Sequence, residues 1–175
     1  MRALGPGSVS SFLKIILDVV YVALWIGAGV TAILALGSLV FDIDPALFGR
    51  QLTVRIDASG LPRQLLTTDL FAVTAYAIGV LIIVDRLRRI FSTLTAGDPF
   101  HPDNVRRLRV VGVMLAALEL GRYPVVAVTL WLAPKADVSQ SGVNLTAWFA
   151  VLVVFVLAEV FREGARLRRE AELTI

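Results

Sequence analysis

Hydrophobic residues in this chain are gathered into four long runs that short polar segments separate. The runs cover residues 19–41, 65–84, 110–133 and 143–158. At about 1.5 Å per residue, each run can cross a hydrocarbon layer of about 30 Å as a helix, the last one with a small extension at its ends. Because backbone groups must be paired inside lipid, helices are the expected structure. The pattern predicts an all-α polytopic membrane protein with four transmembrane helices in a compact bundle.

The chain is interpreted as a single membrane domain over residues 1–175, and one outer segment has a pattern of its own. Residues 51–57 alternate polar and apolar side chains and then meet an Ala-Ser-Gly turn, which predicts one amphipathic strand. Together with residues 135–142 it would form a small outer strand or hairpin, or simply lie over the span ends. The predicted spans are 13–41, 65–94, 104–133 and 143–162, with an outer loop at 42–64, a hinge at 95–104 and a tail at 163–175.

Basic residues are distributed unevenly among the connections. The segment between the second and third runs has six arginines and the segment after the fourth run has four, whereas the third connection has only Lys135. By the positive-inside rule, the hinge and both termini are cytoplasmic, and an even number of spans agrees with this. Trp131 and Trp148 would then lie at the outer interface, where indoles prefer to sit. We therefore expect a multi-pass protein of the inner (cytoplasmic) membrane.

The composition of the chain argues against several kinds of functional site. The chain is 57% hydrophobic and only 18% charged, where soluble domains are about 45–50% apolar and about a quarter charged. It has no cysteine and a single histidine, His101, so neither disulfides nor a multi-histidine metal site is expected. Gly-rich phosphate loops and serine elbows are also missing. The sequence predicts no enzyme activity and no cofactor, and it assigns the basic residues to membrane topology rather than to nucleic-acid binding.

Charged residues inside the spans are the usual candidates for function. Glu119 lies close to the middle of the third span, and Arg122 follows it at i+3. Glu119 could serve as the proton or cation site of a small transporter or channel-like protein, or it could form a structural pair with Arg122. The nearness of Arg122 favours the structural interpretation. Asp18, with Lys14 at i−4, and Glu159 lie nearer the span ends and are interpreted as interfacial.

The hinge has the residue order of a helix start. His101 precedes Pro102, which suits the first helical position, so His101 is assigned to helix capping or loop packing. Further along, apolar residues recur in the tail at helical spacing. They are Val160, Gly164, Leu167 and Ala171, and charged residues on the other faces are spaced to form ion pairs. After the second run, Leu87, Ile90, Phe91 and Leu94 also keep helical spacing. This segment and the tail are therefore predicted to extend the second and fourth spans into the cytoplasm.

Two segments resemble signatures of a bacterial family of four-span membrane proteins, domain of unknown function 2975. The first is Gly97-Asp98-Pro99-Phe100 followed by Asn104, Arg106-Arg107-Leu108-Arg109 and Gly112. The second runs from Leu157 to Ala165 and continues with Leu167 and the last four residues, from Glu172 to Ile175. His101 departs from the pattern, since members often carry Ser or Thr there, and a hydroxyl is the better cap. The resemblance implies no activity, but it implies genes that neighbour small helix-turn-helix regulators of the Cro/repressor type.

The resemblance and the charge pattern together suggest a role for the inner face. We expect a non-enzymatic regulatory module that binds or sequesters a small cytoplasmic helix-turn-helix protein; the alternative is a small transporter that uses Glu119. Arginines on anionic lipid headgroups are an equally good account of the basic residues, so membrane lipids are expected partners too. Small residues at helix-packing spacing also allow a homo-oligomer. The predicted partner contacts are Phe100, Asn104, Arg106, Arg107, Arg109, Arg162, Arg166 and Arg169.

Overall fold

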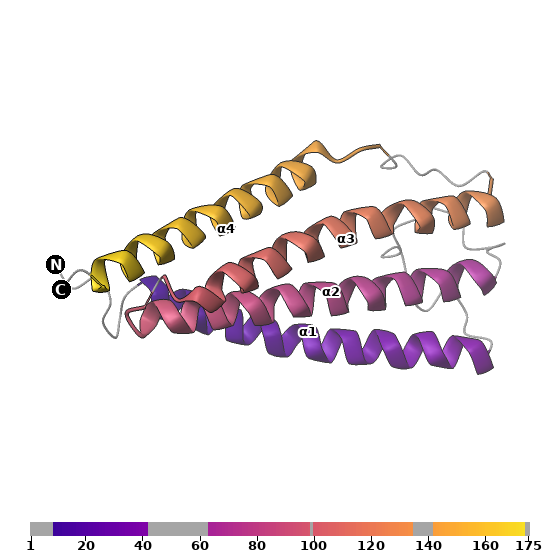
Figure 1. Ribbon diagram of the computed structural model, residues 1–175. Coiled ribbons are helices and arrows are strands. Elements are labelled where there is room, and N and C mark those ends of the chain that lie inside the picture. Colours follow the sequence, from indigo (N-terminus) through magenta and orange to yellow (C-terminus); the bar gives the residue numbers. More distant parts are fainter. Residues whose placement is uncertain (1–8, 42–62, 99, 135–141, 174–175) are drawn as a thin grey trace.

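The computed structural model describes residues 9–41, 63–98, 100–134 and 142–173, and within these ranges every regular element is a helix (Figure 1). The all-α prediction with four long apolar helices is therefore confirmed. The strand predicted at residues 51–57 and most of the segment 135–142 lie outside the described residues. The helices are α1 (Val9–Val40), α2 (Arg63–Thr95), α3 (Pro102–Leu132) and α4 (Leu145–Glu172).

All four helices are long and apolar enough to cross a membrane. They contain 28 to 33 residues, so each is about 42–50 Å long. That length exceeds the hydrocarbon thickness of about 30 Å, which places at least one end of each helix among headgroups or in water. α2 continues to Thr95 and α4 to Glu172, so both helices extend well past their apolar runs, as predicted.

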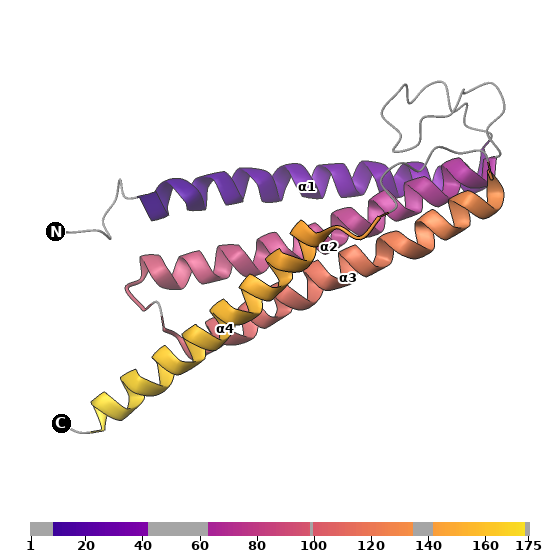
Figure 2. The ribbon, with the colours of Figure 1, turned by 90° about the horizontal axis from the view of Figure 1, so that it is seen from above.

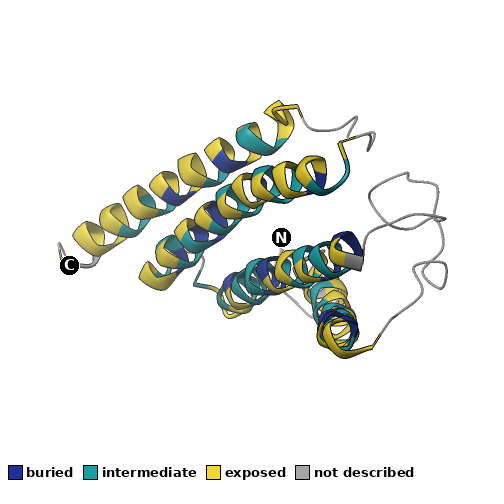
Figure 3. Ribbon diagram, turned by 90° about the vertical axis from the view of Figure 1, so that its right-hand side faces the viewer, coloured by how far each residue is buried: buried dark blue, intermediate teal, exposed yellow. Residues whose placement is uncertain are grey.

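Each helix packs mainly against its neighbour in the chain, in the order α1, α2, α3, α4. Seen end-on, the α1–α2 pair and the α3–α4 pair are joined through α2 and α3 (Figure 3). α4 crosses the hinge end of α3, and its C-terminal turns project beyond the hinge (Figure 2). Large apolar side chains such as Phe12, Trp25 and Trp131 are exposed over the outside of this arrangement, as lipid-facing helices require.

Small residues let neighbouring helices approach closely. Ala35 of α1 is 1% exposed and packs against Leu66 and Leu70 of α2. Gly79 of α2 lies under the side chain of Leu118, where an added Cβ would come within 2.5 Å. Gly112 of α3 lies under the Phe155 ring of α4, and a Cβ added there would come within 3.1 Å of the ring. Each interface between consecutive helices therefore has at least one small residue that lets the two backbones approach closely. Helices associate in this way in lipid.

The hinge ends α2 and starts α3 with standard capping chemistry. Gly97 adopts a φ of 83°, a conformation that favours glycine, and closes α2. Its amide donates to the Leu94 carbonyl at 3.1 Å, and the Asp98 amide donates to the Thr93 carbonyl at 3.0 Å, which is a Schellman motif. His101 then caps α3, because its Nδ1 accepts from the Asp103 amide at 3.2 Å, with Pro102 following. The capping role predicted for His101 is confirmed.

Candidate functional site

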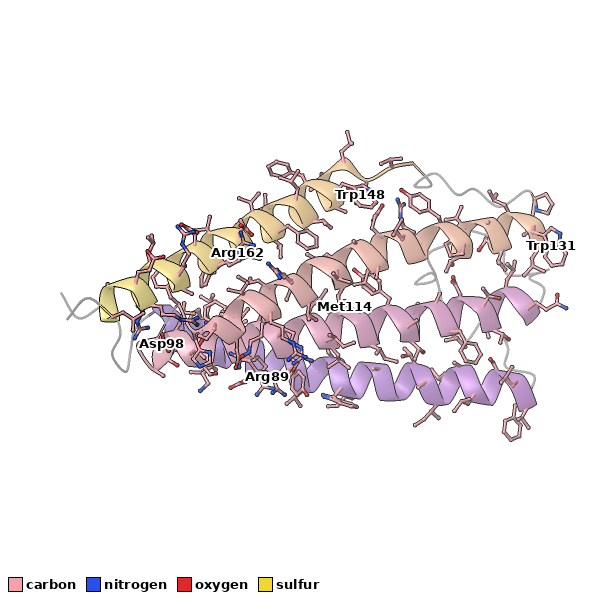
Figure 4. All side chains as sticks on the ribbon, viewed as in Figure 1. Arg89, Asp98, Met114, Trp131, Trp148 and Arg162 are labelled. Carbon is pink, nitrogen blue, oxygen red and sulfur yellow. The ribbon has the colours of Figure 1, made fainter. Side chains whose placement is uncertain are left out.

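The hinge and the end of α4 are packed together, although about 60 residues separate them in sequence. The Phe100 ring lies directly over Gly164, where a Cβ would come within 2.5 Å of it. The same ring packs against Phe161, with centroids 5.8 Å apart and planes tilted by 50°. Asp98 and Arg168 form an ion pair across this contact. We call these five residues the hinge–tail junction (Figure 4, near the Asp98 label).

An apolar cluster beneath the junction joins α2, α3 and α4. Ile90, Leu108 and Ala158 are its buried members, at 6%, 8% and 2% exposed. Leu87, Leu94 and Phe161 pack around them. Phe161 therefore belongs both to this cluster and to the junction above it. The cluster fixes the angle at which α4 leaves the other helices and so determines where its projecting end lies.

The most deeply buried side chain of the region is polar. Asn104 is 0% exposed, and its Nδ2 donates to the Thr93 hydroxyl at 2.7 Å. Its Oδ1 accepts from Arg107 at 3.0 Å, and Arg107 also donates to the Arg89 carbonyl at 3.1 Å. Asn104 was predicted to contact a partner protein, but its side chain is fully buried and bonded within the protein. The hydrogen bonds of its side-chain amide hold the start of α3 against the end of α2, and Arg107 contributes to the same contact.

The remaining predicted contact residues have different surroundings. Phe100 forms the junction and keeps 39% of its surface exposed. Arg162 pairs with Glu159, one turn earlier on α4, so Glu159 is an exposed surface residue of the helix rather than a group inside the bundle. Arg166 lies between Glu163 at 2.6 Å and Glu170 at 3.5 Å. Arg106, Arg109 and Arg169 are exposed, and within the described ranges no ion pair is seen for them.

A second polar contact joins α1 to α2 at a similar level. Arg88 pairs with Asp18 at 2.5 Å and lies 4.3 Å above the centre of the Tyr21 ring. The sequence had suggested Lys14 as the partner of Asp18, because i−4 spacing was the only pairing that the sequence could reveal. In the structure the ion pair seen for Asp18 is with another helix. Asp18 thus contributes to helix association as well as to the membrane interface.

The predicted pair of Glu119 and Arg122 is present in α3, and Arg122 also bonds a backbone carbonyl. Glu119 is 8% exposed, and its carboxylate accepts from Arg122 at 2.8 Å. Arg122 also donates to the Gly142 carbonyl at 2.7 Å, just before α4 begins. α4 therefore starts at the level of Arg122, ten residues or about 15 Å before α3 ends. In the structural interpretation, Glu119 and Arg122 therefore have a specific role. Glu119 holds Arg122, and Arg122 satisfies the Gly142 carbonyl just before α4 begins.

This arrangement separates two tryptophans that were expected to share one interface. Trp131 is 81% exposed at the far end of α3. Trp148 belongs to the first turn of α4, where its amide donates to the carbonyl of the N-cap Asn144 at 3.2 Å. Figure 4 shows the two side chains at clearly different levels along α3. The two indoles that were expected at one interface thus lie at different levels, because α4 starts part-way along α3, which the sequence does not reveal.

Gly164 provides a direct test of the hinge–tail junction. Replacing it with alanine should lower the free energy of unfolding by about 1 kcal/mol, because crowding Phe100 costs about 1–3 kcal/mol while alanine gains up to about 1 kcal/mol in helix propensity. Thermal unfolding in detergent micelles, followed by circular dichroism, would measure this. Gly121→Ala is the matched control, since no atom lies within 4 Å of an added Cβ there. Equal stability of the two variants would mean that the junction does not form.

The chain matches a known protein family over most of its length. The family described as protein of unknown function, DUF2975, matches residues 51–175. The chain belongs to the DUF2975 family. No curated protein and no solved structure matches it. The DUF2975 match covers the last three helices and hence the complete hinge–tail junction, whereas α1 lies outside it. This DUF2975 chain is a membrane protein with four helices able to span the bilayer.

Sequence reasoning had found the two halves of this site without their contacts. It had paired the hinge with the tail as neighbours on one membrane face, but it had missed the Phe100–Gly164 packing and the Asp98–Arg168 pair. A signal was present, since Gly164 interrupts an otherwise apolar stripe in a helix, where glycine is unfavourable unless something packs on it.

Proposed function

We propose that this protein is a non-enzymatic membrane anchor that docks a small cytoplasmic helix-turn-helix regulator on its hinge side. The observation that carries the proposal is the hinge–tail junction, because it holds the projecting end of α4 in one position. Residues 165–172 lie past the contact with Phe100 and form about two further turns, about 12 Å long. The proposal places this end in the cytoplasm, in line with the arginine distribution and the positive-inside rule.

The C-terminal part of α4, from Val160 onward, presents an apolar strip that the protein itself leaves uncovered. Val160 and Leu167 are 56% and 54% exposed, and Ala171 is exposed as well. Since seven residues make almost two turns, these side chains share one face of α4. Gly164, which the sequence placed in the same stripe, is covered by Phe100 and drops out of it. We call Val160, Leu167 and Ala171 the tail stripe.

Charges beside the tail stripe support a helical partner. Glu163, Arg166 and Glu170 form a ladder of ion pairs along one edge of it. An apolar stripe bordered by both signs of charge is what one amphipathic helix offers another, with apolar contacts for affinity and charges for orientation. Small helix-turn-helix proteins are made of such helices, and the gene setting implied by the family resemblance supplies them as neighbours. These points support this partner class over others.

The transporter alternative has less support. A transported cation or proton needs a carboxylate whose charge is open to it, whereas the Glu119 charge is already balanced by Arg122 at 2.8 Å. Arg122 is in turn held by the Gly142 carbonyl. Both contacts are explained by the assembly of α3 with the start of α4. Docking is therefore the function we propose.

Changing Leu167 to serine should weaken docking about tenfold or more while leaving the membrane domain intact. Burying a leucine at an interface is worth about 1.5–3 kcal/mol, so its loss should weaken binding about tenfold or more. The measurement is capture of the tagged protein from native membranes in mild detergent, with bound proteins identified by mass spectrometry, followed by a binding titration with the purified partner. Leu173→Ser is the matched control, because Leu173 is 82% exposed but lies off the tail stripe.

Two outcomes would count against the proposal. One is that the wild-type protein recovers no helix-turn-helix protein. The other is that the Leu167 and Leu173 variants bind the captured regulator equally well, which would place the contact elsewhere. A partner of another fold that depends on Leu167 would keep the surface and overturn the partner class.

A further inference from the structure

We propose that Arg106 and Arg109 bind the phosphate of an anionic phospholipid in the leaflet on the hinge side of the protein. This site lies on the lipid-facing side of α3 and is separate from the tail stripe. It assigns these two arginines to the membrane and removes them from the set of residues available to a protein partner. The argument rests on their depth, their orientation and their surroundings.

Depth follows from the exposed face of α3. An uninterrupted row of exposed apolar side chains begins at Val113 and ends at Trp131, a separation of 18 residues or about 27 Å. That distance matches the hydrocarbon thickness of about 30 Å. Trp131 then marks one headgroup layer, and the residues just before Val113 lie in the other. The row also includes Ala117, Leu120, Pro124 and Val128.

Orientation separates three arginines that are consecutive or nearly so in sequence. Arg106 and Arg109 are exposed, and they lie about two turns and one turn before Val113 on the same face. At i, i+3 spacing their Cβ atoms are about 5–6 Å apart, close enough for both guanidinium groups to reach one phosphate. Arg107 points the other way, toward Asn104 and the Arg89 carbonyl. The exposed pair is therefore selected by the helix face rather than by charge alone.

The side chains around Arg106 and Arg109 leave both guanidinium groups open to an external anion. The carboxylate nearest in sequence, Asp103, lies 3.8 Å from His101 Nδ1 and 3.9 Å from Arg107. No described carboxylate pairs with Arg106 or Arg109, whereas Arg162 and Arg166 on α4 have glutamate partners. A guanidinium donates two parallel hydrogen bonds to phosphate oxygens, and an anionic leaflet attracts each basic residue further. Phospholipid headgroups are the anions present at this depth.

Native mass spectrometry of the purified full-length protein tests the site. Micelles are supplemented with palmitoyl-oleoyl-phosphatidylglycerol or with the matching phosphatidylcholine, and the dissociation constant of the first bound lipid is measured. We expect tighter binding of phosphatidylglycerol, and we expect Arg106→Gln with Arg109→Gln to weaken it about 30-fold. Arg162→Gln with Arg166→Gln removes the same charge from α4 and should change it less than threefold. Circular dichroism establishes that each variant keeps its helices.

Each contrary result identifies a different error. Equal binding of the two lipids, or an equal loss in both double variants, would overturn a specific headgroup site. Saturation of the pair by inorganic phosphate, with no preference for phosphatidylglycerol, would assign it to a free anion instead. Loss of regulator capture in the Arg106 and Arg109 double variant would show that these arginines serve the protein partner. The docking experiment on Leu167 does not depend on any of these outcomes.

Discussion

Replacing Arg122 with methionine should lower the free energy of unfolding by about 3–5 kcal/mol, the typical penalty for removing one partner of a buried ion pair. Glu119 would be left as a carboxylate that is only 8% exposed, with no guanidinium beside it. The Gly142 carbonyl would lose its donor at the same time. Methionine fills a similar space and favours helix, so packing and propensity change little. The charge and the hydrogen bonds account for nearly all of the effect.

Thermal unfolding in micelles should show this as a fall of roughly 10 °C in Tm. The informative control is the double variant with Glu119→Gln and Arg122→Met, which removes both charges. It should recover most of the lost stability, because a neutral pair at this position is tolerated far better than a single charge. If Arg122→Met alone is as stable as the wild type, then the three-group contact does not hold the start of α4.

A third variant, Glu119→Gln alone, separates structure from transport. Glu119→Gln alone keeps an acceptor oxygen for Arg122 and leaves the charge of Arg122 partly balanced by the Gly142 carbonyl. A structural Glu119 should therefore tolerate the change with a loss of about 1–3 kcal/mol. A transport site would lose its activity while the protein stayed folded. The structural account thus predicts that stability, and not a flux, responds to Glu119.

The fold was predictable because the bilayer leaves few alternatives. Four apolar runs such as 65–84 can only be helices in lipid, and the arginine asymmetry predicts their orientation. Capping was also readable, since His101 before Pro102 is a local pattern and the cap forms within two residues. Local patterns of this kind depend on backbone geometry alone, so no knowledge of the neighbouring helices was required.

Contacts between helices were not predictable, because they depend on the vertical offset of one helix against another. The chain reveals that Asp18 has a lysine at i−4, but only the packing of α1 on α2 brings Arg88 to it. Likewise the apolar run of the fourth span does not show that α4 begins beside Arg122. Gly164 and Phe100 meet for the same reason. Offset is set by side-chain fit along the whole interface, which no single motif encodes.

The buried amide at the start of α3 illustrates the limit most clearly. An asparagine among arginines after a proline has the composition of an exposed loop, and the sequence accordingly suggested that Asn104 meets a partner. Its 0% exposure instead makes it the polar bond between α2 and α3. Replacing it with leucine should lower the free energy of unfolding by about 2–4 kcal/mol. Leucine has the same branching and the same number of side-chain heavy atoms, but it is bulkier and leaves the charged Arg107 donor without its side-chain acceptor.

Thermal unfolding in micelles, followed by circular dichroism, measures the loss of stability in this variant. The control is Asn104→Asp, which keeps the acceptor for Arg107 but cannot donate to Thr93, and it should lose less stability than the leucine variant. Because the Thr93 hydroxyl already donates to the Ile90 carbonyl at 2.7 Å, it stays satisfied in both variants. An aspartate variant less stable than the leucine variant would show that burial, and not Arg107, dominates at this position.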